Sequence, residues 1–328
     1  VDQFFIGRTV GELGNAATNI AFPLTTMCLA AMLALGIGGA AGFNLNMGAG
    51  NKKKAMYFIG NALTVMFGVG VVIALISLFF MEPLLKFFGS PDSVLPYAKE
   101  YVGVVAFGFP FVMVANGGSH LVRADGSPKF SMYCNLAGAI INVILDYLFV
   151  MRGMSGAALA TVIGQIVSFM MVVWYMRHYK TAKIERKHLI PCKEFVFRTL
   201  HLGMAQGINQ LAMMIVQIVM NQSLKYYGGL SIYGASIPIA CAGIIMKVNQ
   251  LYFSICIGVA QGIQPIASFN TGAGNYDRVK KTYKIAVTCN TVVSTIAFLI
   301  FQLFPRQIIG IFGSGSNEYF MFAEKFLR

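Results

Sequence analysis

Long apolar runs separated by short polar and charged connections dominate the chain. Most of the runs reach the roughly 20 residues that a helix needs to cross the hydrocarbon core of a bilayer. The run from Tyr226 to Tyr276 is interrupted only by Lys247, and we take it as one long helix. The pattern therefore predicts spanning helices over residues 13–51, 55–81, 101–122, 130–145, 153–176, 199–224, 226–276 and 285–305.

Composition supports this interpretation. The chain has 328 residues, of which 57% are hydrophobic and only 11% are charged, and its mean hydropathy is +0.68. A soluble domain carries about a quarter charged residues, so a soluble enzyme is excluded. The six cysteines are scattered without CxxC spacing and predict neither a zinc site nor a disulfide framework. We expect no cofactor.

The distribution of Lys and Arg gives an orientation. Sixteen of them fall in one set of alternate connections and eight in the other, with Lys247 inside a span. The richer set holds Lys52–Lys54, Arg123, Lys129, the cluster from Arg177 to Arg198 and the cluster from Arg278 to Lys284. Basic connections face the cytoplasm. The net charge of +13 is therefore a topology signal, and we expect no nucleic-acid partner.

An internal repeat organises the spans. The motif that begins at Asn46 and ends at Asn51 returns 224 residues later, from Asn270 to Asn275, and a basic cluster follows it each time. Upstream, the second copy is longer, which predicts one short insertion within a span. We also expect a proline inside the second span of each half, at Pro23 and Pro238. Parallel repeats of this kind are typical of transporters.

The repeat predicts an all-α polytopic membrane protein with two six-helix lobes. Because the chain begins and ends inside apolar segments, we expect it to be truncated at both ends of a twelve-helix parent. The predicted parts are an N-terminal lobe at residues 1–177 with span 1 partial, a cytoplasmic linker at 178–198, and a C-terminal lobe at 199–328 with spans 7–9 and the start of span 10.

The residues resemble a known family. The runs "VDQFFIGRTVGELGNAATNIAFPL", "GAGNKKKA", "RADGSPKFSMYCNLAGAIINVILDYLFV", "GAALATVIGQ" and "GVAQGIQPIASFNTGAG" are similar to those of the multidrug and toxic compound extrusion (MATE) transporters, in order and spacing over nearly the whole chain. The resemblance implies a two-lobed antiporter that exports bulky organic cations in exchange for Na⁺ or H⁺. It points to the bacterial branch whose coupling acids lie in the N-terminal lobe.

Two carboxylates, Asp2 and Asp146, fall within apolar spans, whereas the other ten lie in or beside connections. A charge at mid-bilayer costs at least about 2.5 to 3.5 kcal/mol, so retained acids usually mark an ion, proton or substrate path. Asn142 precedes Asp146 by one helical turn, so its amide oxygen can join the carboxylates around a hard cation.

The resemblance matches Asp2 to the family's first-span acid, Asn142 and Asp146 to its fifth-span polar pair, and Thr161 to a sixth-span hydroxyl. The alternatives are inert helix-end carboxylates for the two acids, and for Thr161 a hydroxyl bonded to its own helix.

A polar stripe marks the seventh span. Gln206, Gln210, Met213 and Gln217 share one helical face, with Asn221 beyond them. We expect this stripe to line a central substrate cavity, with hydrogen bonding between the lobes as the alternative. Asn116 in the fourth span is a further cavity candidate, and the role of Lys247 stays open.

The sequence therefore predicts a cation-coupled exporter of organic cations in the bacterial inner membrane, with basic loops in the cytoplasm and lipid around a monomer. A lipid-linked oligosaccharide flippase of the same superfamily would need a cavity rich in Arg and Lys. A membrane enzyme would need paired acids or metal ligands at a water-facing loop. The repeat and the intramembrane acids argue against a receptor that does not transport.

Overall fold

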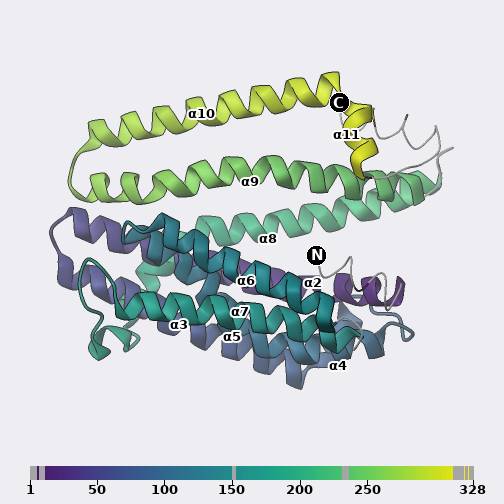
Figure 1. Ribbon diagram of the computed structural model, residues 1–328, viewed down its shortest axis with the longest axis horizontal. Coiled ribbons are helices and arrows are strands. Elements are labelled where there is room, and N and C mark those ends of the chain that lie inside the picture. Colours follow the sequence, from purple (N-terminus) through teal and green to yellow (C-terminus); the bar gives the residue numbers. More distant parts are fainter. Residues whose placement is uncertain are drawn as a thin grey trace. The chain divides into compact units, whose positions relative to one another are not determined.

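The computed structural model describes residues 6, 12–149, 153–230, 236–312, 321 and 324, and these residues are almost entirely helical (Figure 1). Eight helices in these ranges are long and apolar enough to cross a membrane. The all-α, polytopic fold class predicted from the sequence is confirmed. The helices are α2 (Glu12–Gly48), α3 (Lys52–Phe79), α4 (Met81–Phe87), α5 (Leu95–Ala124), α6 (Pro128–Phe149), α7 (Met154–Arg177), the 3₁₀ turn η2 (Arg186–Leu189), α8 (Lys193–Gly229), α9 (Ser236–Gly272), α10 (Tyr276–Leu303) and α11 (Pro305–Phe312).

The long apolar run at residues 226–276 holds one complete helix, α9, as the sequence predicts. The predicted start is wrong, because Tyr226 and Tyr227 belong to the end of α8. Helix α8 is also longer than expected at its other end, where it begins at Lys193, inside the predicted linker. Charged residues at helix ends are solvated, so an apolar run underestimates helix length.

The repeated motif forms the same helix end twice. Gly50 and Gly274 adopt left-handed backbone conformations, with φ of +78° and +75°. In each copy the Asn after the glycine donates its backbone N–H to the carbonyl of the Asn five residues earlier, at 2.8 Å and 2.9 Å. This is the Schellman arrangement, which needs a glycine because a Cβ is disfavoured at positive φ.

The offset of 224 residues holds over three consecutive helices. Helices α2 and α9 both have 37 residues, α3 and α10 both have 28, and α4 and α11 begin at Met81 and Pro305. The predicted insertion within a span is therefore wrong. At this offset Glu12 corresponds to Ser236 and Gly48 to Gly272, so nothing is inserted within either helix.

The prolines do not follow the repeat. Pro23 lies inside α2 as predicted, but Pro238 is the third residue of α9. Proline is tolerated in a first turn because that N–H has no intrahelical partner. The interior proline of α9 is Pro265.

The chain forms two compact units. Unit 1 contains residues 1–211 together with 271–274, and unit 2 contains residues 212–270 and 275–328. In unit 1, α5 is the most deeply buried span and packs against α2, α3, α6 and α7. Close approaches are made by glycines: a Cβ on Gly36 would lie 2.7 Å from the carbonyl oxygen of Gly117, and one on Gly70 would lie 2.6 Å from Cα of Pro110. This packing positions the polar side chains described next.

Candidate functional site

A polar cavity of about 210 Å³ lies inside unit 1, between α5, α6 and α7. These helices are apolar over most of their length, so amides and hydroxyls gathered at one place are unusual. Ligand sites in transporters combine such polar groups with an otherwise apolar wall. The polar residues that line the cavity are Asn116, Asn135, Asn142, Thr161, Gln165 and Ser168.

Asn142 and Thr161, which the sequence placed in one site, lie together. Nδ2 of Asn142 donates to Oγ1 of Thr161 at 3.3 Å. The Thr161 hydroxyl donates to the carbonyl of Ala157 at 3.1 Å, on its own helix, so the backbone-bonded alternative for this residue is also present. Both residues line the cavity, one from α6 and one from α7, and their contact joins the two helices there.

Two glycines bring α6 and α7 close enough for that contact. A Cβ on Gly164 would lie 2.7 Å from the carbonyl oxygen of Gly138 and 3.1 Å from Cβ of Asn142. Glycine is the residue that allows helix backbones to approach this closely in a membrane. The separation between Asn142 and Thr161 is thus set by residues that carry no side chain.

Asp146 lies in α6, four residues after Asn142, and its side chain is fully buried, with 0% of its surface exposed. Positions four apart share a helix face. The rest of α6 is largely exposed, because only 17% of its most apolar stretch is buried. A carboxylate is thus retained inside the protein on a helix whose other faces are open, next to the Asn142–Thr161 pair.

Asp2, the other acid of the predicted cation site, lies outside the described residues, so only the position of Asp146 is described. Within the described ranges, no three His, Cys, Asp or Glu side chains are grouped as a metal site of that type would require. The donors gathered around Asn142 are amide and hydroxyl oxygens, which suit a hard cation.

A second cavity, of about 250 Å³, adjoins the first between α2, α5 and α7. Asn116, Thr161 and Gln165 line both cavities, so they form a shared wall. The sequence identified Asn116 and Thr161 but missed Gln165. The available signal was its spacing, because Gln165 follows Thr161 by four residues and therefore shares its helix face.

The seventh-span stripe lies on α8 as predicted, but it is divided between the two units. Gln206 is exposed and Gln210 is half-buried in unit 1, whereas Met213 and Gln217 belong to unit 2. Exposed or half-exposed amides on an apolar helix are compatible with a cavity lining. The side chains of Asn221 and Lys247 lie outside the described residues.

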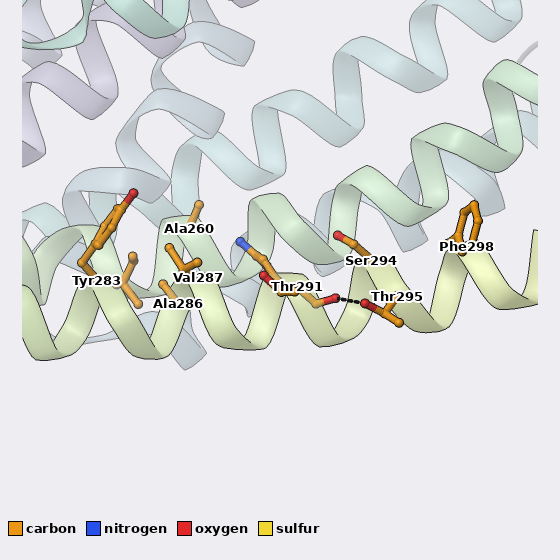
Figure 2. A pocket seen from close by; sticks show the side chains of 10 residues that line it. Ala260, Tyr283, Ala286, Val287, Thr291, Ser294, Thr295 and Phe298 are labelled. Carbon is orange, nitrogen blue, oxygen red and sulfur yellow. Dashed lines mark hydrogen bonds between the residues drawn. The ribbon is translucent and has the colours of Figure 1, made fainter.

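Unit 2 contains an open pocket of about 630 Å³ between α9 and α10, with Thr291, Ser294 and Thr295 on its wall (Figure 2). The repeat explains this pocket. Subtracting 224 from four of its lining positions gives Gly36, Gly39, Met66 and Gly70, which face α5 in unit 1. No counterpart of α5 lies among the described residues of unit 2. We therefore interpret the pocket as a helix-packing surface, the counterpart on α9 and α10 of the surface of α2 and α3 that contacts α5, and not as a ligand site.

Comparisons with known proteins agree with this architecture. The family model MatE matches residues 1–148 and 207–328. The probable multidrug resistance protein YoeA of Bacillus subtilis (strain 168) is 24% identical over 323 residues, which cover 95% of this chain and 68% of that protein. The multidrug export protein MepA of Staphylococcus saprophyticus is 25% identical over 313 residues, which cover 93% and 68%.

Solved structures share the fold. An outward-facing multidrug resistance MATE family transporter of the MOP superfamily superposes with a TM-score of 0.89 at 22% identity, covering 100% of this chain and 72% of that one. A MATE structure in the straight conformation gives a TM-score of 0.90 at 21% identity, with the same coverage. With the family model matching most of its length, the chain belongs to the multidrug and toxic compound extrusion (MATE) family of membrane transporters.

Proposed function

We propose that this protein exports organic cations across the bacterial inner membrane in exchange for Na⁺ or H⁺, and that Asn142, Asp146 and Thr161 bind the coupling cation. The observation that carries the proposal is the fully buried Asp146, one turn from the Asn142–Thr161 contact. A buried carboxylate is costly unless a cation or proton compensates its charge, so the site gains a cation more readily than a neutral site does.

The shared wall of the two cavities supplies a route for coupling. Asn116, Thr161 and Gln165 contact both spaces, so a change at the cation cavity alters the surface of the second cavity. We assign the second cavity and the stripe on α8 to the substrate. The names of the relatives, a multidrug resistance protein and a multidrug export protein, support an exporter of this substrate class.

Exchange follows from linkage between the two ligands. If cation binding weakens substrate binding, substrate binding weakens cation binding by the same factor. Alternating access of two lobes around the sites then converts an imposed cation gradient into export. Asp2 is included in the cation site on the family resemblance alone. We propose that a monomer carries out this cycle with no resident cofactor.

The test is gradient-driven export of a fluorescent organic cation from proteoliposomes that contain the full-length protein. A Na⁺ gradient and a pH gradient are imposed separately, so that the two arms identify the coupling ion. Asp146→Asn keeps the size of the side chain but removes its charge, and it should abolish export while the protein still inserts.

Asp92→Asn is the matched control, because it removes the same charge from an exposed connection. Wild-type export by Asp146→Asn would remove Asp146 from the mechanism. Export by the native protein that is independent of both gradients would overturn the antiport proposal as a whole.

A further inference from the structure

The segment between α7 and α8, residues 178–192, is bound to unit 1 at two separate places. We call it the connecting segment. Because it leads toward the unit boundary, it is the obvious place for a flexible joint. Its hydrogen bonds indicate a different arrangement.

The first attachment is Asp125, a buried carboxylate in the tight turn between α5 and α6. Its Oδ2 accepts the backbone N–H of Lys180 at 2.7 Å, and its Oδ1 accepts that of Thr181 at 3.1 Å and also the Thr181 hydroxyl. Nearby, the Tyr179 hydroxyl donates to the carbonyl of Leu121 at 3.0 Å. Charged acceptors with several backbone donors hold a segment firmly.

The second attachment is Asn61, a fully buried side chain of α3. Its Nδ2 donates to the carbonyl of His188 at 3.1 Å, and its Oδ1 accepts the N–H of Cys192 at 2.6 Å. One turn further along α3, the Thr64 hydroxyl donates to the carbonyl of Leu189 at 2.8 Å. Both ends of one buried amide are therefore satisfied by the connecting segment, as a buried polar group requires.

Aromatic packing continues the attachment into α8. Tyr57 of α3 stacks on Phe195 with ring centroids 5.0 Å apart and meets the His188 ring edge-on at 4.8 Å. Phe58 meets Phe195 edge-on at 5.2 Å. The first turn of α8 is thus fixed to the same helix that holds the connecting segment.

We propose that the connecting segment and the start of α8 move as one rigid part of unit 1, and that the joint between the lobes lies inside α8, between Gly207 and Ala212. The two units separate between Leu211 and Ala212, within an unbroken helix. Gly203 and Gly207 precede this boundary and allow α8 to pack closely on α2, because a Cβ on either would meet the carbonyl oxygen of Ala34 or of Ala30. The inference rests on the alternating access proposed above.

The position of this joint has a consequence for the polar stripe. Gln206 and Gln210 precede the boundary between the units, whereas Met213 and Gln217 follow it. Bending of α8 therefore changes the spacing between the two halves of the stripe, so that the helix presents a different set of amides in each state of the transport cycle.

The test measures distances between pairs of spin labels by double electron–electron resonance in full-length protein with its native cysteines replaced. Lys53, Lys187 and Lys280 are exposed positions on α3, on η2 and on α10. The three pairs are measured with and without substrate, at two pH values and with and without Na⁺. We expect the 53–187 distance to be narrow and constant, and the 187–280 and 53–280 distances to shift together.

A 53–187 distance that shifts as much as the 187–280 distance would overturn the inference. A constant 53–280 distance in all conditions would instead count against alternating access, while the width of the 53–187 distribution still tests the attachment. Thr64→Val removes only the bond to Leu189 and should broaden the 53–187 distribution slightly. Asn61→Leu, which removes both bonds, should broaden it more. Equal widths in both variants and the parent would contradict the role of these bonds.

Discussion

Gly50 and Gly274 lie 224 residues apart and share one backbone conformation, at φ of +78° and +75°. Each ends a helix of 37 residues and is followed by a helix of 28. An internal repeat visible in five letters of sequence thus corresponds to the same hydrogen-bonded helix end in both halves.

Gly50→Ala should lower the free energy of unfolding by about 1 to 2 kcal/mol, because an L-residue at this positive φ is strained. Gly274→Ala should have a similar effect. Gly50→Asn should cost less, since Asn tolerates the left-handed region better. Thermal unfolding in detergent measures all three, and an alanine variant as stable as the parent would show that the turn tolerates a Cβ.

Gly164→Ala should reduce export by separating α6 from α7. The new Cβ would meet the carbonyl oxygen of Gly138, and relieving that overlap should cost about 1 to 3 kcal/mol. The Asn142–Thr161 contact should lengthen as a result. Gly68→Ala is the control, because a Cβ there meets nothing within 4 Å. Equal export by the two variants would show that transport does not depend on the spacing between α6 and α7.

Asp125→Asn should destabilise unit 1 by about 2 kcal/mol, because an amide has one acceptor oxygen in place of two and hydrogen bonds to charged groups are worth about 1.5 to 3 kcal/mol. Asp92→Asn, at an exposed position, should change the free energy of unfolding by less than about 0.5 kcal/mol. Melting temperatures in detergent compare the two. Similar shifts for both variants would refute the structural role of Asp125.

The attachment of η2 should weaken in acid. Burial lowers the pKa of His188, with Glu185 opposing this effect and Lys187 adding to it, while the Tyr57 ring covers the imidazole. Its Nδ1 accepts the N–H of Glu185 at 3.0 Å, which requires the unprotonated nitrogen. Because the folded state binds fewer protons, the stabilisation is full above the ordinary pKa of about 6.5 and is lost as the pH falls below it.

Hydrogen exchange of residues 178–192, corrected for its intrinsic pH dependence, should therefore be faster at pH 5.5 than at pH 7.5 by more than exchange in α3. His188→Asn keeps an acceptor near the Nδ1 position without a titratable ring, and it should remove the difference. A difference that persists in this variant would assign the pH effect to another group.

Single cysteines at Lys53 and Arg278 should share one side of the membrane. Each position follows one of the repeated turns, and α9 between the two copies is a single helix. The excess of Lys and Arg predicts the cytoplasmic side. An impermeant thiol reagent added to intact cells should label neither cysteine, and labelling of only one would contradict the shared topology.

Periodicity and composition predicted the helical class, the single helix α9 and the repeat, because apolar length and a glycine-containing turn are local signals. They predicted an insertion within a span, whereas α2 and α9 have equal lengths, and Pro238 lies in the first turn of α9 and not in its interior. The placement of Asn142 and Thr161 in one candidate site followed from a family resemblance, and the hydrogen bond between them was not predicted. Asp125 and Asn61 were missed because their partners are backbone groups about 55 and 130 residues away, and a backbone N–H carries no sequence signature.

The surface of α2 and α3 that contacts α5 and the matching surface of α9 and α10 carry different side chains. Gly36, Gly39 and Gly70 are replaced in the second copy by Ala260, Ile263 and Ser294, and Met66 by Asn290. Helix α5 approaches α2 so closely that a methyl group at position 36 would overlap the α5 backbone. A Cβ is already present at the corresponding position of α9, Ala260, so a helix that packed between α9 and α10 would have to keep a wider separation from α9 than α5 keeps from α2.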